Sequence, residues 1–401
     1  MFPLIRENVT YNIVPLPKEK WRGTPIPMRY TTTEYYDVAV SQSPNVFQVT
    51  LEKKSFAKPV SHTPEEYDFP DRLYQDHWEK AYAWGVIKDN EMIACIETCP
   101  EEWSNRLMVT ELWVHENYRR RGIAHALMEL AKEQVRRERR RALILETQSC
   151  NGGAIAFYLQ EGFTLIGFDS CCYQNHDLDR KEVRLDLGIL YDKKPPLRRD
   201  DVEIRPETEA DCHATEAMTM RAFWNKYHRG CDEHLLVHKI RKSDEYVAQI
   251  SRVAVKDGKV IGCIMYSRAR LERDGKTMEV LNFGPLCVDP EWQGMGVGKM
   301  LLEETVSLAR NAGYPGIIIF GEADYYPKAG FVTCDKLGIT TADGKNFDAF
   351  MGYELEKDAL KNFGGSFHVS NVFFDLPSEE VEEFSKQFPP LQKQYFPGQW
   401  D

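Results

Sequence analysis

A chain of 401 residues with a hydrophobic fraction of 42% is long enough for two domains and apolar enough for packed cores, which excludes an intrinsically disordered protein. Its net charge of −11 argues against a nucleic-acid binder that relies on overall positive charge. Without a run of about 18 apolar residues or a signal-peptide pattern, we expect a cytoplasmic protein that makes no membrane contact. The ten cysteines form no CxxC pairs, so we expect reduced thiols and no metal site.

The first 30 residues are expected to form an N-terminal extension, followed by a domain over 31–192. Within that domain, "WGVIKDNEMIACIE" (84–97) contains two apolar runs joined by Asp89-Asn90, a pattern that predicts a β-hairpin. A further apolar run, "LMVTELWV", is expected to be a strand and leads directly into the octet "NYRRRGIA" (117–124).

The octet combines basic residues, a glycine and a small residue where a strand is expected to pass into a helix. Backbone N–H groups at the start of a helix have no partner within the helix, and a loop that gathers them binds anions such as phosphate. Gly122 has no Cβ, so a phosphate could approach the backbone there. The alternative interpretation is a basic surface loop capped by a glycine.

The predicted elements after the octet are an amphipathic helix, a buried strand and a second helix. Leu127, Leu130, Ala131 and Val135 fall on one face of the first helix. "ALILE" (142–146) is expected to be a buried strand, and "AIAFYLQEGF" follows it. The segment 193–201 has two prolines and many charges, which predicts an exposed linker.

The second half repeats these motifs in the same order and at nearly the same spacing. "VAVKDGKVIGCIMY" matches the first hairpin, "QGMGVG" (293–298) matches the octet, and "EADYYPKAGF" matches "AIAFYLQEGF". Each half reads as strand, helix, hairpin, strand, loop, helix, strand, helix, strand, so we interpret the chain as a tandem duplication. The second domain is expected over 202–356, with a tail over 357–401 packed on it.

Both halves resemble the GNAT superfamily of acyl-CoA N-acyltransferases, whose signature is a [Gln/Arg]-x-x-Gly-x-[Gly/Ala] loop after the fourth strand and a later FYxxxGF segment. The first half is also similar to streptothricin (nourseothricin) acetyltransferases, through "EEWSNRLMVTELWVHENYRRRGIAHALMELAK" and "KEVRLDLGI". The second half, with "FGPLCVDPEWQGMGVG", is similar to small predicted bacterial acetyltransferases.

This resemblance implies an α/β (α+β) protein of two tandem GNAT folds. Each would have a mixed, mostly antiparallel twisted sheet with helices on both faces and a cleft between splayed fourth and fifth strands. It also implies acetyl-CoA, with the pyrophosphate on the two loops and the thioester carbonyl near the N–H of Val114 or Val288. The implied acetyl-CoA contacts are Trp113, Val114, Arg119, Arg120, Arg121, Gly122, Ile123, Ala124, Asn151, Cys287, Val288, Gln293, Gly294, Met295, Gly296, Val297 and Gly298.

The resemblance places Tyr158, and Tyr326 in the second half, where the family's general acid stands. The alternative for each is an aromatic core residue with a hydrogen-bonded hydroxyl. Glu111, on the strand before the octet, is the expected general base, with a structural ion pair as the alternative. The second half has no carboxylate on the matching strand, so its base is left unassigned.

An acidic and aromatic cluster in the first half suggests the acceptor. Glu97, Glu101 and Trp103 lie near Glu111 in sequence, and carboxylates beside indoles suit a cationic amine. A polar hairpin with ordinary exposed acids is the alternative. We expect acetylation of a primary amine on a small cationic molecule, such as a streptothricin-type antibiotic. The rival functions are a protein or peptide N-acetyltransferase and a half retained only to bind acetyl-CoA, and the chain is expected to be a monomer or homodimer.

Overall fold

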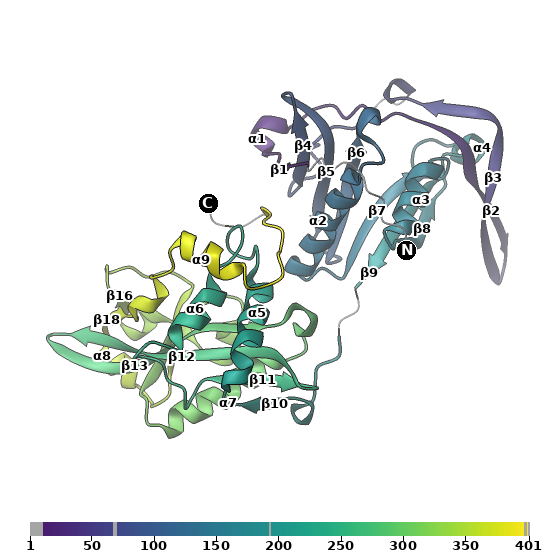
Figure 1. The fold of residues 1–401 in the computed structure, drawn as a ribbon. Coiled ribbons are helices and arrows are strands. Elements are labelled where there is room, and N and C mark those ends of the chain that lie inside the picture. Colours follow the sequence, from purple (N-terminus) through teal and green to yellow (C-terminus); the bar gives the residue numbers. More distant parts are fainter. Residues whose placement is uncertain (1–10, 67–69, 192–193, 397–398, 400–401) are drawn as a thin grey trace. The chain divides into compact units, whose positions relative to one another are not determined.

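The computed structural model describes residues 11–66, 70–191, 194–396 and 399, and it divides into two compact units, Met1–Lys193 and Lys194–Asp401 (Figure 1). We call them unit 1 and unit 2. Within the described ranges, no helix combines the length and the apolar character that crossing a membrane requires.

Unit 1 is built on a seven-stranded sheet with the order β1-β4-β5-β6-β7-β9-β8. Neighbouring strands are antiparallel except β6 and β7, which are parallel. The strands are β1 (Ile13–Pro15), β4 (Tyr82–Lys88), β5 (Glu91–Glu101), β6 (Arg106–Val114), β7 (Ala142–Gln148), β8 (Thr164–Asp169) and β9 (Arg184–Leu190). The helices are α1 (Lys18–Trp21), α2 (Ile123–Glu138), α3 (Gly152–Gln160) and α4 (Asp177–Arg180).

Helix α2 connects the two parallel strands and packs across the sheet (Figure 1). The four residues predicted to share one helix face, Leu127, Leu130, Ala131 and Val135, are all buried. A separate apolar cluster that includes Leu16, Leu73 and Trp113 forms a second core. The sheet is therefore held by apolar burial, the main stabilising term in folding.

Two features of unit 1 differ from the sequence-based expectation. Residues 13–15, expected within an N-terminal extension, form an edge strand that pairs with Trp84–Val86 of β4; residues 1–10 lie outside the described ranges. A long antiparallel ribbon of β2 (Tyr30–Ser43) and β3 (Val46–His62) takes the place of a full helix before the hairpin (Figure 1). The ribbon follows from a run rich in β-branched and aromatic residues on both sides of a turn at Pro44-Asn45.

Unit 2 has a nine-stranded sheet with the main order β10-β11-β12-β13-β14-β17-β15, and β18 pairs with β12 and β16. The strands are β10 (Glu203–Arg205), β11 (Arg252–Lys256), β12 (Lys259–Arg273), β13 (Lys276–Val288), β14 (Gly316–Phe320), β15 (Val332–Thr333), β16 (Ile339–Thr341), β17 (Phe350–Glu354) and β18 (Gly365–His368). The helices are α5 (Cys212–Phe223), α6 (Glu233–Ile240), α7 (Val297–Asn311), α8 (Ala359–Phe363) and α9 (Ser378–Ser385).

Both faces of this sheet are covered. Ile264 and Met265, which are adjacent in β12, belong to different cores because strand side chains alternate between faces. One core contains Leu301 of α7, and the other contains residues of α5, α6 and α9. The C-terminal segment expected as a tail supplies β18 to the sheet and α9 to the second core.

The segment after β14 differs from the expected helix. It forms a single 3₁₀ turn, Tyr326–Ala329, that ends at Gly330 with φ of 92°. Pro327 lacks a backbone N–H and cannot extend a helical hydrogen-bond ladder, which explains the short turn. The predicted class, two tandem α/β units with mixed sheets, is confirmed.

Candidate active site

The octet of unit 1 forms a tight loop between β6 and the start of α2. Arg120 has φ of 59° and Gly122 has φ of 83°, and Gly122 is the N-cap residue of α2. A Cβ on Gly122 would meet no atom within 4 Å, so the space in front of the loop is open. A depression of about 180 Å³ lies here, lined by Tyr11, Ile13, Arg121, Gly122, Ile123 and Ala126.

The equivalent loop of unit 2 has the same backbone conformation. Gly294 and Gly296 have φ of 78° and 89°, and Gly296 is the N-cap residue of α7. Arg119 Nε donates to Val114 O at 3.0 Å, and Gln293 Nε2 donates to Val288 O at the same distance. The first residue of each motif therefore braces its loop against the preceding strand, which explains why arginine and glutamine both serve there.

Two of the predicted loop contacts in unit 1, Arg119 and Arg121, have protein partners for their side chains. Arg119 Nη2 also donates to Arg29 O at 3.0 Å. The Arg121 guanidinium lies 5.2 Å from the Tyr118 ring centroid and donates to Tyr11 Oη and Asn117 O. Ile123 is buried, so the loop presents mainly backbone groups to a ligand.

The strands that precede these loops separate from their parallel neighbours. Strands β6 and β7 pair over Arg106–Val109 only, and β13 pairs with β14 at Leu281 alone. The N–H of His115 donates to Ile93 O, and successive N–H groups of a strand point to opposite sides, so the N–H of Val114 faces away from β5. In unit 2, the backbone N–H of Asp289 donates to Ile261 O, so the N–H of Val288 likewise faces away from β12.

Glu111 and Glu97 lie directly opposite each other on β6 and β5, beside a bulge at Thr110. Glu97 is fully buried and accepts hydrogen bonds from Tyr74 N (2.5 Å) and Thr110 Oγ1 (2.8 Å). Glu111 is 7% exposed, and its carboxylate has no hydrogen bond or ion pair to any described residue. Burial raises the pKa of Glu111 well above its usual range, and the negative charges of nearby carboxylates add to the rise.

Two of the carboxylates whose negative charge raises the pKa of Glu111 were missed by sequence reasoning. They are Asp71 and Glu146. Burial raises the pKa of both side chains. Glu146 forms an ion pair with Arg184 at 2.8 Å. Asp71 stands in a loop without a motif, so no sequence signal could have found it. Glu146, however, directly follows the apolar run "ALIL" within β7, and a carboxylate directly after a buried apolar run was a usable signal.

Tyr158 lies on α3 and is buried beside Phe157 and Phe163. Its hydroxyl has no hydrogen-bond partner among the described residues. Burial raises the pKa of Tyr158, and the charge of Glu111 raises it further, so the two side chains share one environment. Asn151 is the N-cap residue of α3, and its Oδ1 accepts from Ala154 N at 3.2 Å.

Four other predicted site residues lie away from the Glu97–Glu111 pair or have side chains buried in cores. Glu101 is paired with Arg106 at 2.6 Å near the tip of the β5–β6 hairpin. Trp103, at the same tip, is 86% exposed. The structure thus places Glu101 and Trp103 away from the Glu97–Glu111 pair. The side chains of Trp113 and Cys287 are buried in cores, so only their backbone groups are available to a ligand.

The matching region of unit 2 has different chemistry. Tyr326 packs against Gly321, where a Cβ would come within 2.2 Å of the tyrosine ring, and burial raises the pKa of Tyr326. Glu322 is neutralised by Lys226, whose Nζ lies 2.5 Å from its Oε1. Tyr227 Oη also lies 3.5 Å from Glu322, and sequence reasoning missed both loop residues because they carry no motif.

Comparison with known proteins gives matches in both units. A model of the acetyltransferase (GNAT) family matches residues 49–163, and a model of the acetyltransferase (GNAT) domain matches residues 247–333. The uncharacterised Escherichia coli N-acetyltransferase YjhQ is 36% identical over 101 residues, which span 25% of this chain and 55% of YjhQ. The E. coli N-acetyltransferase YhbS, also uncharacterised, is 26% identical over 163 residues, 40% of this chain and 92% of YhbS.

An E. coli streptothricin acetyltransferase is 30% identical over 132 residues, which span 32% of this chain and 73% of that enzyme. The chain belongs to the GNAT family of acetyltransferases. It is therefore an N-acetyltransferase with acetyl-CoA as its acyl donor, built from two GNAT domains in tandem.

Proposed function

We propose that unit 1 transfers an acetyl group from acetyl-CoA to a primary amine of a small cationic acceptor. The observation that carries this proposal is Glu111. It is a buried carboxylate with no cationic partner among the described residues, opposite Glu97 and in the environment of the Tyr158 hydroxyl. The ionised form of such a group is stable only beside a positive partner, because an unpaired buried charge is costly. A protonated amine would supply that partner when it enters the cleft.

The loops fit the diphosphate of the donor. In each unit, two backbone positions with positive φ turn into a helix N-terminus, where N–H groups and the helix dipole favour an anion. The open space at Gly122 and at Gly294 leaves room for phosphate oxygens close to the backbone. Acetyl-CoA, when bound, supplies an acyl thioester whose thiolate is the leaving group.

The splayed strands of unit 1 offer the next contacts. The Val114 N–H, which faces away from β5, is oriented to donate to a carbonyl oxygen in the gap between β6 and β7. A donor fixed before the reaction stabilises negative charge that develops on that oxygen. Asn151 Oδ1 already caps α3, so the proposed contact of this side chain with acetyl-CoA falls to its Nδ2.

The raised pKa values of Glu111 and Tyr158 indicate which side chain accepts a proton and which donates one. Glu111 accepts a proton from the acceptor ammonium, since its raised pKa makes it a stronger base than an exposed glutamate. Tyr158 keeps its proton at neutral pH because burial raises its pKa, so it has a proton to donate to the leaving sulfur. In unit 2, Tyr326 is the corresponding candidate acid.

The acceptor class is tested by following CoA release from the full chain with a panel of amines. Streptothricin and polyamines represent cationic acceptors, a neutral amide-bearing amine of similar size represents uncharged ones, and lysine-containing peptides represent the protein-acetylation alternative. We expect the cationic small molecules to give the highest kcat/KM. Equal or better turnover of peptides would favour that alternative. Growth on streptothricin of cells that express the protein tests the antibiotic as an acceptor directly. The cytoplasmic location and the monomer or homodimer state stay predictions.

Each unit is expected to bind one acetyl-CoA, so calorimetry should give a stoichiometry of two. Gly122→Trp and Gly296→Trp should each reduce it to one, because either change puts a bulky side chain at a positive-φ position in front of the loop N–H groups. A wild-type stoichiometry of one, abolished by Gly122→Trp alone, would show that unit 2 has lost donor binding.

Acceptor charge recognition is expected to depend on Asp71 and not on Glu101. Asp71→Asn removes a carboxylate that acts on Glu111 and should raise the KM for cationic acceptors about 10- to 150-fold, the range of a charge-assisted contact. Glu101→Gln is the matched control, because Glu101 is already paired with Arg106. Steady-state kinetics at low and high salt measures both. An equal rise for a neutral acceptor would contradict a charge effect.

A further inference from the structure

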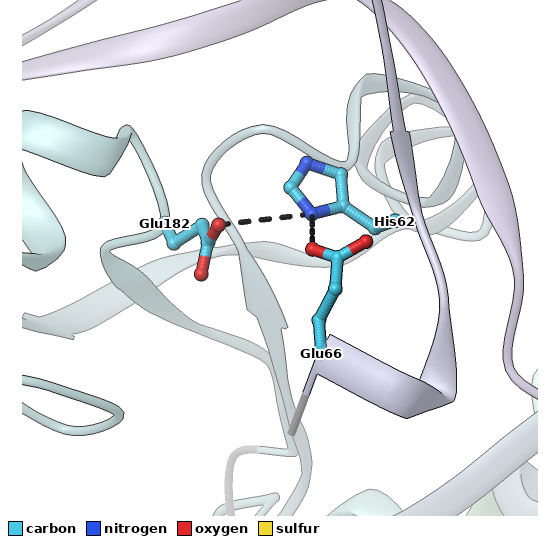
Figure 2. Close-up of side chains that lie close together, drawn as sticks. All are labelled: His62, Glu66 and Glu182. Atoms are coloured by element: carbon cyan, nitrogen blue, oxygen red, sulfur yellow. Dashed lines mark ion pairs between the residues drawn. The ribbon is translucent and has the colours of Figure 1, made fainter.

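We propose that His62, Glu66 and Glu182 of unit 1 bind one divalent transition-metal ion, for which Zn²⁺ is the test case (Figure 2). His62 ends strand β3, Glu66 ends a 3₁₀ turn (Pro64–Glu66) that follows it, and Glu182 precedes strand β9. Both carboxylates approach the same imidazole nitrogen, Nδ1, in Figure 2. This proposal departs from the sequence-based expectation of no metal site, which considered cysteine spacing.

The distances fit ligands of one ion. His62 Nδ1 lies 3.4 Å from Glu66 Oε2 and 3.7 Å from Glu182 Oε1, and all three ligand atoms lie within 4.8 Å of one another. Direct N–H···O hydrogen bonds are shorter, about 2.7–3.2 Å. Two ligand atoms at about 2.0–2.1 Å from a tetrahedral Zn²⁺ are about 3.3–3.4 Å apart. The 3.4 Å His62–Glu66 separation matches this spacing and the 3.7 Å His62–Glu182 separation is slightly longer, so a small side-chain movement would bring all three ligand atoms to bonding distance of one ion.

Each of the three side chains also has a second partner that orients it. Thr63 N donates to Glu66 Oε1 at 3.0 Å, and Arg180 Nη2 donates to Glu182 Oε1 at 2.9 Å. His62 Nε2 lies 3.7 Å from Cys150 Sγ. Ligating histidines and carboxylates are held by such outer contacts in metal sites. His62 and Glu182 are buried while Glu66 is exposed, which gives the ion a path from solvent.

Unit 1 contains a second cluster of the same composition that serves as a comparison. His125, Glu129 and Glu161 also place their ligand atoms within 4.8 Å of one another. There Lys132 Nζ lies 2.8 Å from Glu129 and 2.7 Å from Glu161, so an ammonium occupies the position of a cation. At the proposed site, the Arg180 guanidinium donates to Glu182 Oε1, and no lysine among the described residues pairs with Glu66 or Glu182.

A metal ion here would join the end of the β2–β3 ribbon to the segment before β9. His62 and Glu182 are far apart in sequence, and Tyr30, which stacks on His62 with ring centroids 4.9 Å apart, starts the other strand of the ribbon. Because binding requires the folded arrangement, the ion should stabilise unit 1 against unfolding.

The test uses the full chain with Cys171→Ser and Cys172→Ser, which remove two exposed thiols that could bind Zn²⁺ by themselves. After treatment with a chelator, calorimetric titration with Zn²⁺ should show one site that is weakened at least about 100-fold by His62→Gln and by Glu66→Gln. His125→Gln, in the cluster filled by Lys132, should leave that affinity unchanged. Zn²⁺ should also raise the Tm of the parent protein and of His125→Gln, but not of Glu66→Gln.

Glu66 is exposed, so Glu66→Gln keeps the test valid even if a change at buried His62 prevents folding. Equal Zn²⁺ affinity in the parent and in Glu66→Gln would overturn the proposal. So would loss of binding in His125→Gln, or the absence of any Zn²⁺ site, either of which would mean that His62 forms only an ion pair with the two carboxylates.

Discussion

Replacing Tyr158 by phenylalanine should lower kcat by about 100-fold or more, with little change in the affinity for acetyl-CoA. The substitution removes the proton that we assign to the leaving sulfur, and acid catalysis contributes about 10²–10⁴-fold. Because the Tyr158 hydroxyl has no hydrogen-bond partner among the described residues, its loss should leave the Tm nearly unchanged. Steady-state kinetics with a cationic acceptor, together with thermal unfolding, separates the two effects.

A matched control is Tyr35→Phe, since Tyr35 lies in the ribbon with its ring 4.5 Å from the centroid of Phe56. That variant should retain full activity. If Tyr158→Phe also retains its turnover number, Tyr158 is a core residue and another group protonates the thiolate. The raised pKa of Tyr158 predicts no loss of rate from tyrosine ionisation up to at least pH 10.

Replacing Glu111 by glutamine should lower kcat by a similarly large factor and change the pH dependence of the reaction. In the wild type, kcat/KM should fall as the pH drops through the raised pKa of Glu111, because the protonated carboxyl cannot accept a proton from the ammonium. The Glu111→Gln variant should lose this acidic limb. Its rate should rise with pH as the amine loses its proton in solution, near pH 10.4 for a lysine-like group.

The same substitution should stabilise the fold above acidic pH. The folded-state pKa of Glu111 is raised, so between the unfolded value, about 4.3, and the folded value, the native state holds a proton that the unfolded chain has lost. The free energy of unfolding of the wild type therefore falls by about 1.4 kcal/mol per pH unit over that window. Glu111→Gln carries no such group, so its Tm advantage should grow through the window and then stay constant.

Thermal unfolding at a series of pH values measures this advantage. Glu133→Gln, at a half-buried position on α2 where Glu133 pairs with Arg136, is the control and should show no advantage that grows with pH. A Tm difference between wild type and Glu111→Gln that is independent of pH would mean that the carboxyl is ionised in both states, and Glu111 would lose its assignment as a buried base.

The order of strands and helices around both loops was predictable because it depends on local patterns. The hairpins follow from Asp89-Asn90 and Asp257-Gly258, both of which adopt positive φ values. The buried face of α2 follows from helical periodicity, and the tandem fold follows from repeated motifs. The expectation of a helix after β14 was wrong because "EADYYPKAGF" contains Pro327, which has no backbone N–H, whereas its counterpart "AIAFYLQEGF" contains no proline.

The make-up of the acidic cluster around Glu111 could not be predicted in the same way. Glu97 and Glu111 were named from the sequence, and cross-strand register brings them together. Asp71, in a loop, and Glu146, on strand β7, add their negative charges to the environment of Glu111. Glu101, by contrast, forms an ion pair with Arg106 across the hairpin. Such pairings join residues without a fixed sequence spacing, so no periodicity reveals them.

The sequence by itself determined the family, the two phosphate-type loops and the candidate acid and base, because these depend on residue types at short, fixed spacings. Only the tertiary structure decided which carboxylates are unpaired, where β6 leaves β7, and that His62, Glu66 and Glu182 converge on one point. The physical reason is that desolvation and charge pairing depend on distance in space, and chain folding sets those distances between segments that are remote in sequence.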